Sequence, residues 1–151
     1  MTKPGREVRC MLIPLHEGRL LLPNAAVAEV IGYRDPEPSD QGAHWLQGMV
    51  AWRQRQIPVI DFESLLGRPE VGAGIRQRIA VCYALQPDTA FPMLGLVAQG
   101  IPRLLRVSRA SIESAEASPG GDSPVHMTLS IGDEKLLVPD LDYLQAQLPV
   151  G

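Results

Sequence analysis

An all-β fold is the class that three features of the sequence predict. Apolar residues occur in short runs between turn residues, and they almost nowhere recur at helical spacing over a long stretch. About ten such runs follow one another, which is typical of closed β-barrels. Third, residues 57–65 (IPVIDFESL) resemble residues 136–144 (LLVPDLDYL), and each predicts a strand that enters an Asp-capped helical turn. Two similar corners predict two small packed β-units, each too short to be an independent domain.

The first half of the chain is expected to form two hairpins with a single strand between them. Turn residues 16–19 separate the strands of the first hairpin, and the charged tip Arg53-Gln54-Arg55-Gln56 closes the second. A Pro-rich loop at residues 34–42 ends the middle strand, because proline removes a ladder donor. The expected strands are 8–15, 20–23, 27–33, 45–52 and 57–62, followed by a helical turn at 62–66 that Gly67 ends.

The second half of the chain is expected to form three strands, a loop, a hairpin and a short helix. Strands are expected near residues 76–85, 93–99 and 101–107, with a turn at 86–89 and a bend at Gly100 and Pro102. Residues 114–124 (SAEASPGGDSP) are expected to be a flexible loop. A final hairpin, 125–131 with 135–138, leads into a short helix over residues 140–148.

Charge and composition favour some function classes over others. The net charge is −3 and the pI is about 5.6, whereas nucleic-acid modules usually have a basic face. Two Trp, three Tyr and two Phe provide few stacking platforms, so an oligonucleotide-binding barrel is the weaker alternative. No apolar run has the length of a signal peptide core or a membrane span. We therefore expect a cytoplasmic protein without membrane insertion.

Catalytic and metal-binding motifs are not found in the sequence. His16, His44 and His126 have no nucleophile motif around them, and no P-loop, GxSxG or HExxH occurs. Cys10 and Cys82 stand alone in apolar runs, which predicts buried free thiols. The acid pairs Asp61/Glu63 and Asp140/Asp142 start helical turns, where capping is a simpler explanation than metal binding. We predict a protein that is not an enzyme and has no cofactor.

Several segments in order resemble a known family. Residues 46–62 (LQGMVAWRQRQIPVIDF) are similar to the central pattern of CheW-type coupling proteins, roughly G-V-x-N-x-R-G-x-x-x-P-V-x-D-L. Residues 20–31 resemble the family's Y-x-I-P and V-x-E-I segments, residues 94–97 (LGLV) a later strand, and residues 137–142 (LVPDLD) the closing corner. The resemblance runs from about Val8 to Leu148. Ala51-Trp52, Gln54 and Ala98 depart from the pattern.

The resemblance implies one CheW-like domain over residues 1–151, made of two interleaved and packed five-stranded SH3-like barrels. It further implies a signalling adaptor that joins the cytoplasmic tip of a chemoreceptor to the regulatory domain of a CheA-type histidine kinase. The Trp-Arg version of the central pattern looks most like the ChpC-type proteins of chemosensory systems that control type IV pili and twitching motility.

Eight residues are the candidate partner-binding set. Glu29 interrupts an apolar segment and matches the acid of V-x-E-I, while Arg53 lies at a hairpin tip, where an unpaired arginine is rarely buried. We expect both charges to contact a partner and to be dispensable for folding. The full set is Val27, Glu29, Val30, Gly48, Met49, Trp52, Arg53 and Arg55.

Overall fold

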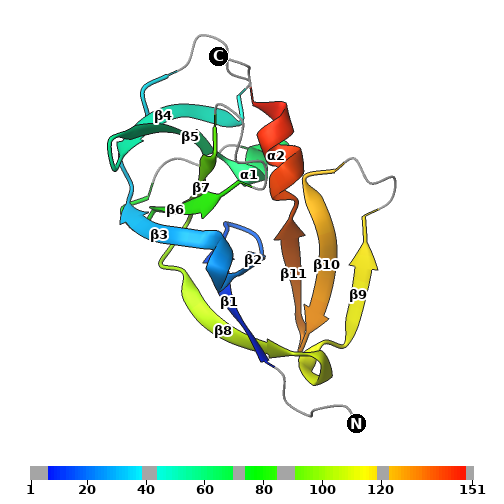
Figure 1. The fold of residues 1–151 in the computed structure, drawn as a ribbon. Helices are drawn as coiled ribbons and strands as arrows, with labels where there is room; N and C mark the ends of the chain where they lie inside the picture. The colour runs from blue at the N-terminus through cyan, green and yellow to red at the C-terminus, as the bar shows by residue number, and fades with distance from the viewer. Residues whose placement is uncertain (1–6, 39–43, 70–73, 85–90, 119–122, 149–151) are drawn as a thin grey trace.

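The strands form two sheets. A computed structural model describes residues 7–38, 44–69, 74–84, 91–118 and 123–148, and Figure 1 shows their arrangement. The first sheet has the order β8 (Arg103–Ser108), β1 (Glu7–Pro14), β2 (Arg19–Pro23), β11 (Glu134–Pro139), β10 (Val125–Ile131) and β9 (Ser114–Ala117). The second has the order β3 (Val27–Gly32), β6 (Arg78–Tyr83), β7 (Met93–Ala98), β5 (Arg55–Ile60) and β4 (Leu46–Trp52). The all-β prediction is confirmed.

The two corners predicted from the internal echo occupy equivalent places. β5 leads into α1 (Phe62–Leu65) and β11 leads into α2 (Leu141–Gln147). Each of these strands also makes a parallel pair, β5 with β7 and β11 with β2, among otherwise antiparallel neighbours. Asp61 accepts hydrogen bonds from the backbone N–H groups of Glu63 and Ser64, and Asp140 accepts one from Tyr143. Both Asp caps are therefore confirmed.

Three clusters of buried apolar side chains form the core of the protein. One belongs to the second sheet and includes Trp52, Ile57 and Ile79, and another belongs to the first sheet and includes Leu12 and Leu136. The largest joins both sheets and α2 through residues such as Ile13, Leu20, Ile60, Phe62, Leu96 and Leu144. Each sheet therefore has its own interior, and a shared core packs one sheet on the other.

One loop prediction was wrong. Ser114–Ala117 forms strand β9, which pairs with β10 from Met127↔Ala117 to Ser130↔Ser114. All four β9 residues are exposed, so no apolar alternation marks the strand, and backbone hydrogen bonds alone place it. The first sheet has six strands rather than five for this reason. Residues 119–122 of the expected loop, and the expected turn at residues 86–89, lie outside the described residues.

Both cysteines are buried free thiols, as predicted. Burial raises the pKa of the Cys82 thiol to about 12 and raises that of Cys10 in the same direction. Trp52 is buried, and Trp45 packs against the shared core.

Candidate functional site

A two-residue turn shapes the tip of the β4–β5 hairpin. Arg53 and Gln54 have φ values of 45° and 64°, and Trp52 pairs directly with Arg55. Positive φ at both central residues defines the tight hairpin turn that matches strand twist. The four-residue tip predicted from the sequence was too long, because Arg55 and Gln56 already belong to β5. The turn holds Arg53 beside the tryptophan that precedes it.

Glu29, Trp52 and Arg53 meet at this tip. The Trp52 Nε1–H donates to Glu29 Oε1 at 2.7 Å, and an Arg53 guanidinium nitrogen lies 3.6 Å from the same oxygen. The Arg53 guanidinium carbon also stands 4.8 Å from the centroid of the Trp52 ring. One carboxylate oxygen of Glu29 thus accepts a hydrogen bond from a buried indole and forms an ion pair with an exposed guanidinium.

The contact between Glu29 and Trp52 joins the two edges of the second sheet. β3 and β4 stand at opposite ends of the strand order, yet Glu29 on β3 reaches Trp52 on β4. A sheet whose edge strands meet has curled into a barrel. Glu29 is therefore both a candidate partner contact and a group that closes the second sheet.

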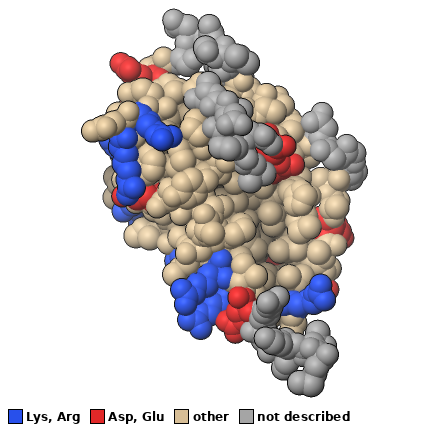
Figure 2. Space-filling model, in the orientation of Figure 1, with Lys and Arg blue, Asp and Glu red and all other residues tan. Residues whose placement is uncertain are grey.

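Exposure separates the roles of the three side chains. Trp52 is 8% exposed and packs in the interior of the second sheet, whereas the side chain of Arg53 is 67% exposed and that of Glu29 is 41% exposed. Figure 2 shows a group of basic side chains over the hairpin tip at the upper left of the view. The buried indole fixes where the charges sit, and the charges face solvent.

Gly48 and Met49 lie further along β4, where a segment after β3 pairs with the strand. Glu37 and Met49 exchange two backbone hydrogen bonds, of 2.8 and 2.9 Å. Gly48 has φ +133°, and a Cβ there would overlap the Glu37 carbonyl. Glycine is needed at this position for a close approach of backbone to backbone.

Val27 and Val30 are half-buried on β3. Val27 packs against the shared core, and the register of β3 against β6 shifts between Val27 and Glu29. The structure therefore brings Glu29, Trp52 and Arg53 into contact, pairs Arg55 with Trp52, and places Val27, Val30, Gly48 and Met49 on the same two edge strands.

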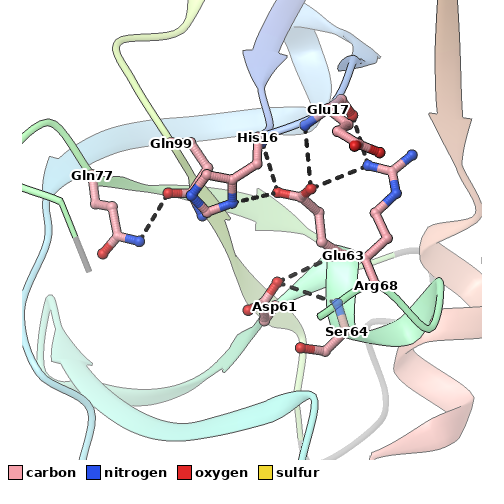
Figure 3. Close-up of polar contacts among 8 residues, drawn as sticks. All are labelled: His16, Glu17, Asp61, Glu63, Ser64, Arg68, Gln77 and Gln99. Carbon is pink, nitrogen blue, oxygen red and sulfur yellow. Dashed lines mark hydrogen bonds and ion pairs between the residues drawn. The ribbon is translucent and has the colours of Figure 1, made fainter. Parts of the chain in front are cut away.

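Sequence reasoning missed a second cluster, around Glu63. This residue was predicted to be a cap, but its side chain is only 7% exposed and turns away from its own helix toward the β1–β2 turn (Figure 3). Glu63 Oε1 accepts from the His16 backbone N–H at 2.8 Å and contacts His16 Nδ1 at 3.2 Å. Because a carboxylate only accepts, Nδ1 carries the proton in this contact.

The other oxygen of Glu63 is also engaged. Glu63 Oε2 accepts from the Glu17 backbone N–H at 3.4 Å and from Arg68 at 3.1 Å, and Arg68 in turn donates to the Glu17 carbonyl. We call Glu63, His16, Glu17 and Arg68 the Glu63 clamp. It ties the first sheet to α1 of the second sheet. The signal in the sequence was an acid between the apolar residues Phe62 and Leu65 of a very short helix.

Gln77 and Gln99 form a second polar contact shown in Figure 3. The Gln77 side-chain amide donates to Gln99 Oε1 at 2.9 Å, and the Gln99 backbone N–H donates to the Pro14 carbonyl. Within the described part of the chain, Gln77 Oε1 is buried without a hydrogen-bond partner.

The described ranges show neither a cluster of candidate metal ligands nor a membrane-spanning helix. These ranges hold no group of three or more His, Cys, Asp or Glu side chains arranged to bind a metal ion. None of their helices has the length and apolar character needed to cross a bilayer.

Comparison with known proteins identifies the family. The model of the CheW-like domain matches residues 9–147. The chain belongs to the CheW-like domain family. The family resemblance seen in the sequence is thereby confirmed, and CheW-like proteins are chemotaxis adaptors rather than enzymes.

A solved structure gives the fold independently. The scaffolding protein TtCheW from Thermoanaerobacter tengcongensis is 20% identical to this chain, with a TM-score of 0.75 over 91% of this chain and 92% of that one. This likeness confirms the predicted architecture of two SH3-like barrels, with an extra strand, β9, in the first sheet. A search of curated protein sequences found no match.

Proposed function

We propose that this CheW-like chain is a non-enzymatic adaptor that couples the cytoplasmic tip of a chemoreceptor to the regulatory domain of a CheA-type histidine kinase. Family membership over residues 9–147 is the observation that carries the proposal. In this proposal the two barrels act as one domain, because a single apolar cluster joins both sheets and α2. The protein acts without a cofactor, next to membrane-bound receptor arrays in the cytoplasm.

The proposed contact surface is the hairpin-tip face, which we define as Val27, Glu29, Val30, Gly48, Met49, Trp52, Arg53 and Arg55. Arg53 supplies an exposed guanidinium that Trp52 and Glu29 hold in one orientation. Preorganised side chains lose less entropy on docking, and arginine and tryptophan are frequent at binding hot spots. An adaptor needs such a surface and needs no reactive group.

Binding of two purified partners tests the proposal. A receptor cytoplasmic-tip fragment and a kinase regulatory domain are titrated with wild type, with Arg53→Ala and with Arg76→Ala, which removes an exposed arginine outside the hairpin-tip face. Truncating a charge that is desolvated on docking costs roughly 2–5 kcal/mol, so Arg53→Ala should weaken at least one complex by about 30-fold or more. Arg76→Ala should bind as wild type does. Equal binding of all three proteins would remove this face from the site.

Control of type IV pili is the proposed output. The Trp52-Arg53 pair in the central pattern supports it, through the resemblance to ChpC-type proteins. Deletion of the gene should abolish twitching on agar while flagellar swimming continues. Loss of swimming alone would assign the adaptor to a flagellar pathway.

A further inference from the structure

A pocket opens in the first sheet, whereas the hairpin-tip face belongs to the second sheet. Its volume is about 260 Å³. Five strands contribute to its wall: β1, β2, β8, β10 and β11. The lining residues are Leu12, Arg19, Arg103, Leu104, Leu105, Ile131, Glu134 and Leu136. We call this the mouth pocket, because it lies at one end of the first barrel.

The floor of the mouth pocket is apolar. Leu12 and Leu136 are buried members of the interior cluster of the first sheet, and Leu105 and Ile131 pack against that cluster. Leu104 stands beside them with 62% of its surface exposed. Exposed apolar surface next to a pocket of this kind is a feature of interaction sites.

The rim of the pocket has an excess of positive charge. Arg19 pairs with Glu134 at 3.4 Å. Arg103 takes part in none of the ion pairs of the described residues. Arg103 is the register partner of Leu12, so its side chain leaves the sheet on the face that carries the apolar floor. Two arginines and one glutamate leave one guanidinium without a counter-charge.

The strand that carries Arg103 is also an edge strand. β8 ends the order of the first sheet, so one row of its backbone groups faces no other strand of that sheet. On the same strand Arg106 stands directly across from Arg9 on β1, and like charges in opposed positions destabilise a sheet. Figure 2 shows basic side chains gathered in the lower part of the view, where Figure 1 places β1 and β8. Arg103 and Arg106 are three positions apart on β8, so their side chains leave opposite faces of the sheet. An extended acidic segment paired with the β8 edge would present carboxylates to both faces and would relieve this repulsion.

The size of the pocket selects the class of ligand. Pockets for small molecules and cofactors enclose about 300–1,000 Å³, and this one is smaller. We propose that the mouth pocket receives one large apolar side chain of an acidic protein segment, which lies along the β8 edge and pairs its carboxylates with Arg103 and Arg106. The apolar floor holds the anchor side chain, the free Arg103 selects a carboxylate beside it, and the open edge offers backbone hydrogen bonds.

Amide shifts in the intact, ¹⁵N-labelled protein test this proposal with a defined probe. The probe is the blocked peptide Asp-Glu-Leu-Phe-Glu-Asp. It should shift the amides of Leu12, Leu105 and Leu136 in a saturable way. Two comparators, Lys-Lys-Leu-Phe-Lys-Lys and Asp-Glu-Ala-Ala-Glu-Asp, should each bind at least about tenfold more weakly, because each lacks one of the two required features.

Two variants separate the mouth pocket from the hairpin-tip face. Arg103→Glu reverses the charge at the rim and should weaken the acidic peptide by about tenfold or more, while Arg55→Glu makes the same change at the hairpin tip and should leave its affinity unchanged. The proposal is overturned if the acidic peptide does not bind at millimolar concentration, if the basic peptide binds equally, if Arg103→Glu binds as wild type does, or if the shifts centre on the hairpin tip. None of these results bears on receptor or kinase binding through Arg53.

Discussion

Glu29 and Glu63 are two carboxylates with opposite surroundings. Glu29 is partly exposed and shares one oxygen between the Trp52 indole and Arg53, whereas Glu63 is buried and uses both oxygens on His16, Glu17 and Arg68. Burying a charge is costly unless several donors satisfy it, so a buried carboxylate of this kind is part of the structure. A half-exposed carboxylate contributes less to folding stability and remains available to a partner. The difference predicts which acid sets stability and which one sets binding.

The largest effect is expected from Glu63→Ala. The change leaves His16, Glu17 and Arg68 without their common acceptor, and breaking a buried ion pair costs about 3–5 kcal/mol of unfolding free energy. Urea unfolding measures it. Glu116→Ala on exposed β9 is the control and should stay within about 0.5 kcal/mol of wild type. A loss below about 1 kcal/mol for Glu63→Ala would class the Glu63 clamp with surface ion pairs.

Gly48→Ala should come next, because it tests the backbone of the hairpin-tip face rather than a charge. An added Cβ would overlap the Glu37 carbonyl at a backbone φ of +133°, and strain and overpacking each cost about 1–3 kcal/mol. We expect thermal unfolding to show a loss of about 2 kcal/mol or more. Gly32→Ala is the matched control, since no atom lies within 4 Å of its added Cβ. Equal melting of both variants would contradict the close approach of Glu37.

Glu29→Ala should cost about 1–2 kcal/mol, because the Trp52 indole N–H loses its acceptor. Glu29→Gln keeps an oxygen acceptor at the same place and should remain within about 0.5 kcal/mol of wild type. Chemical denaturation of both variants shows whether the hydrogen bond to Trp52 or the negative charge of Glu29 contributes more to stability. If Gln is as destabilising as Ala, the ion pair with Arg53 and not the indole contact closes the barrel.

The smallest effect on stability is expected from Arg53→Ala. An exposed ion pair and an exposed cation–π contact each contribute up to about 1 kcal/mol, and the side chain is 67% exposed. The melting temperature should therefore change little, while partner binding falls. A large loss of stability would assign Arg53 to the fold and would end the contrast with Glu63.

Local patterns in the sequence predicted most elements of the fold correctly. Strand positions follow from apolar runs and turn residues, and the Asp61 and Asp140 caps follow from their place before short helices. Strand β9 was not predicted, because it is exposed on both faces and has no apolar alternation. The hairpin tip was predicted too long, because a two-residue turn without glycine gives no clear signal in the sequence.

The candidate site was only partly accessible to the same reasoning. Glu29 and Arg53 were selected by resemblance to the family pattern, but their contact with Trp52 depends on how far the second sheet curls. No local signal reports that curl, since β3 and β4 are not neighbours in the sheet. The mouth pocket was not predicted at all, because five separate strands build it.

By itself the sequence determined the strand content, the two capped corners, the buried thiols and the family, since each of these depends on residue type and short-range spacing. Only the tertiary structure decided which acids are partnered. Glu63 lies 47 positions from His16 and Glu29 lies 23 positions from Trp52, so no local pattern links either pair. Sheet closure and the packing of one barrel on the other bring these groups within hydrogen-bond distance. Because Glu63 is buried, its carboxylate must be satisfied by these donors, whereas the partly exposed carboxylate of Glu29 can also contact water or a partner.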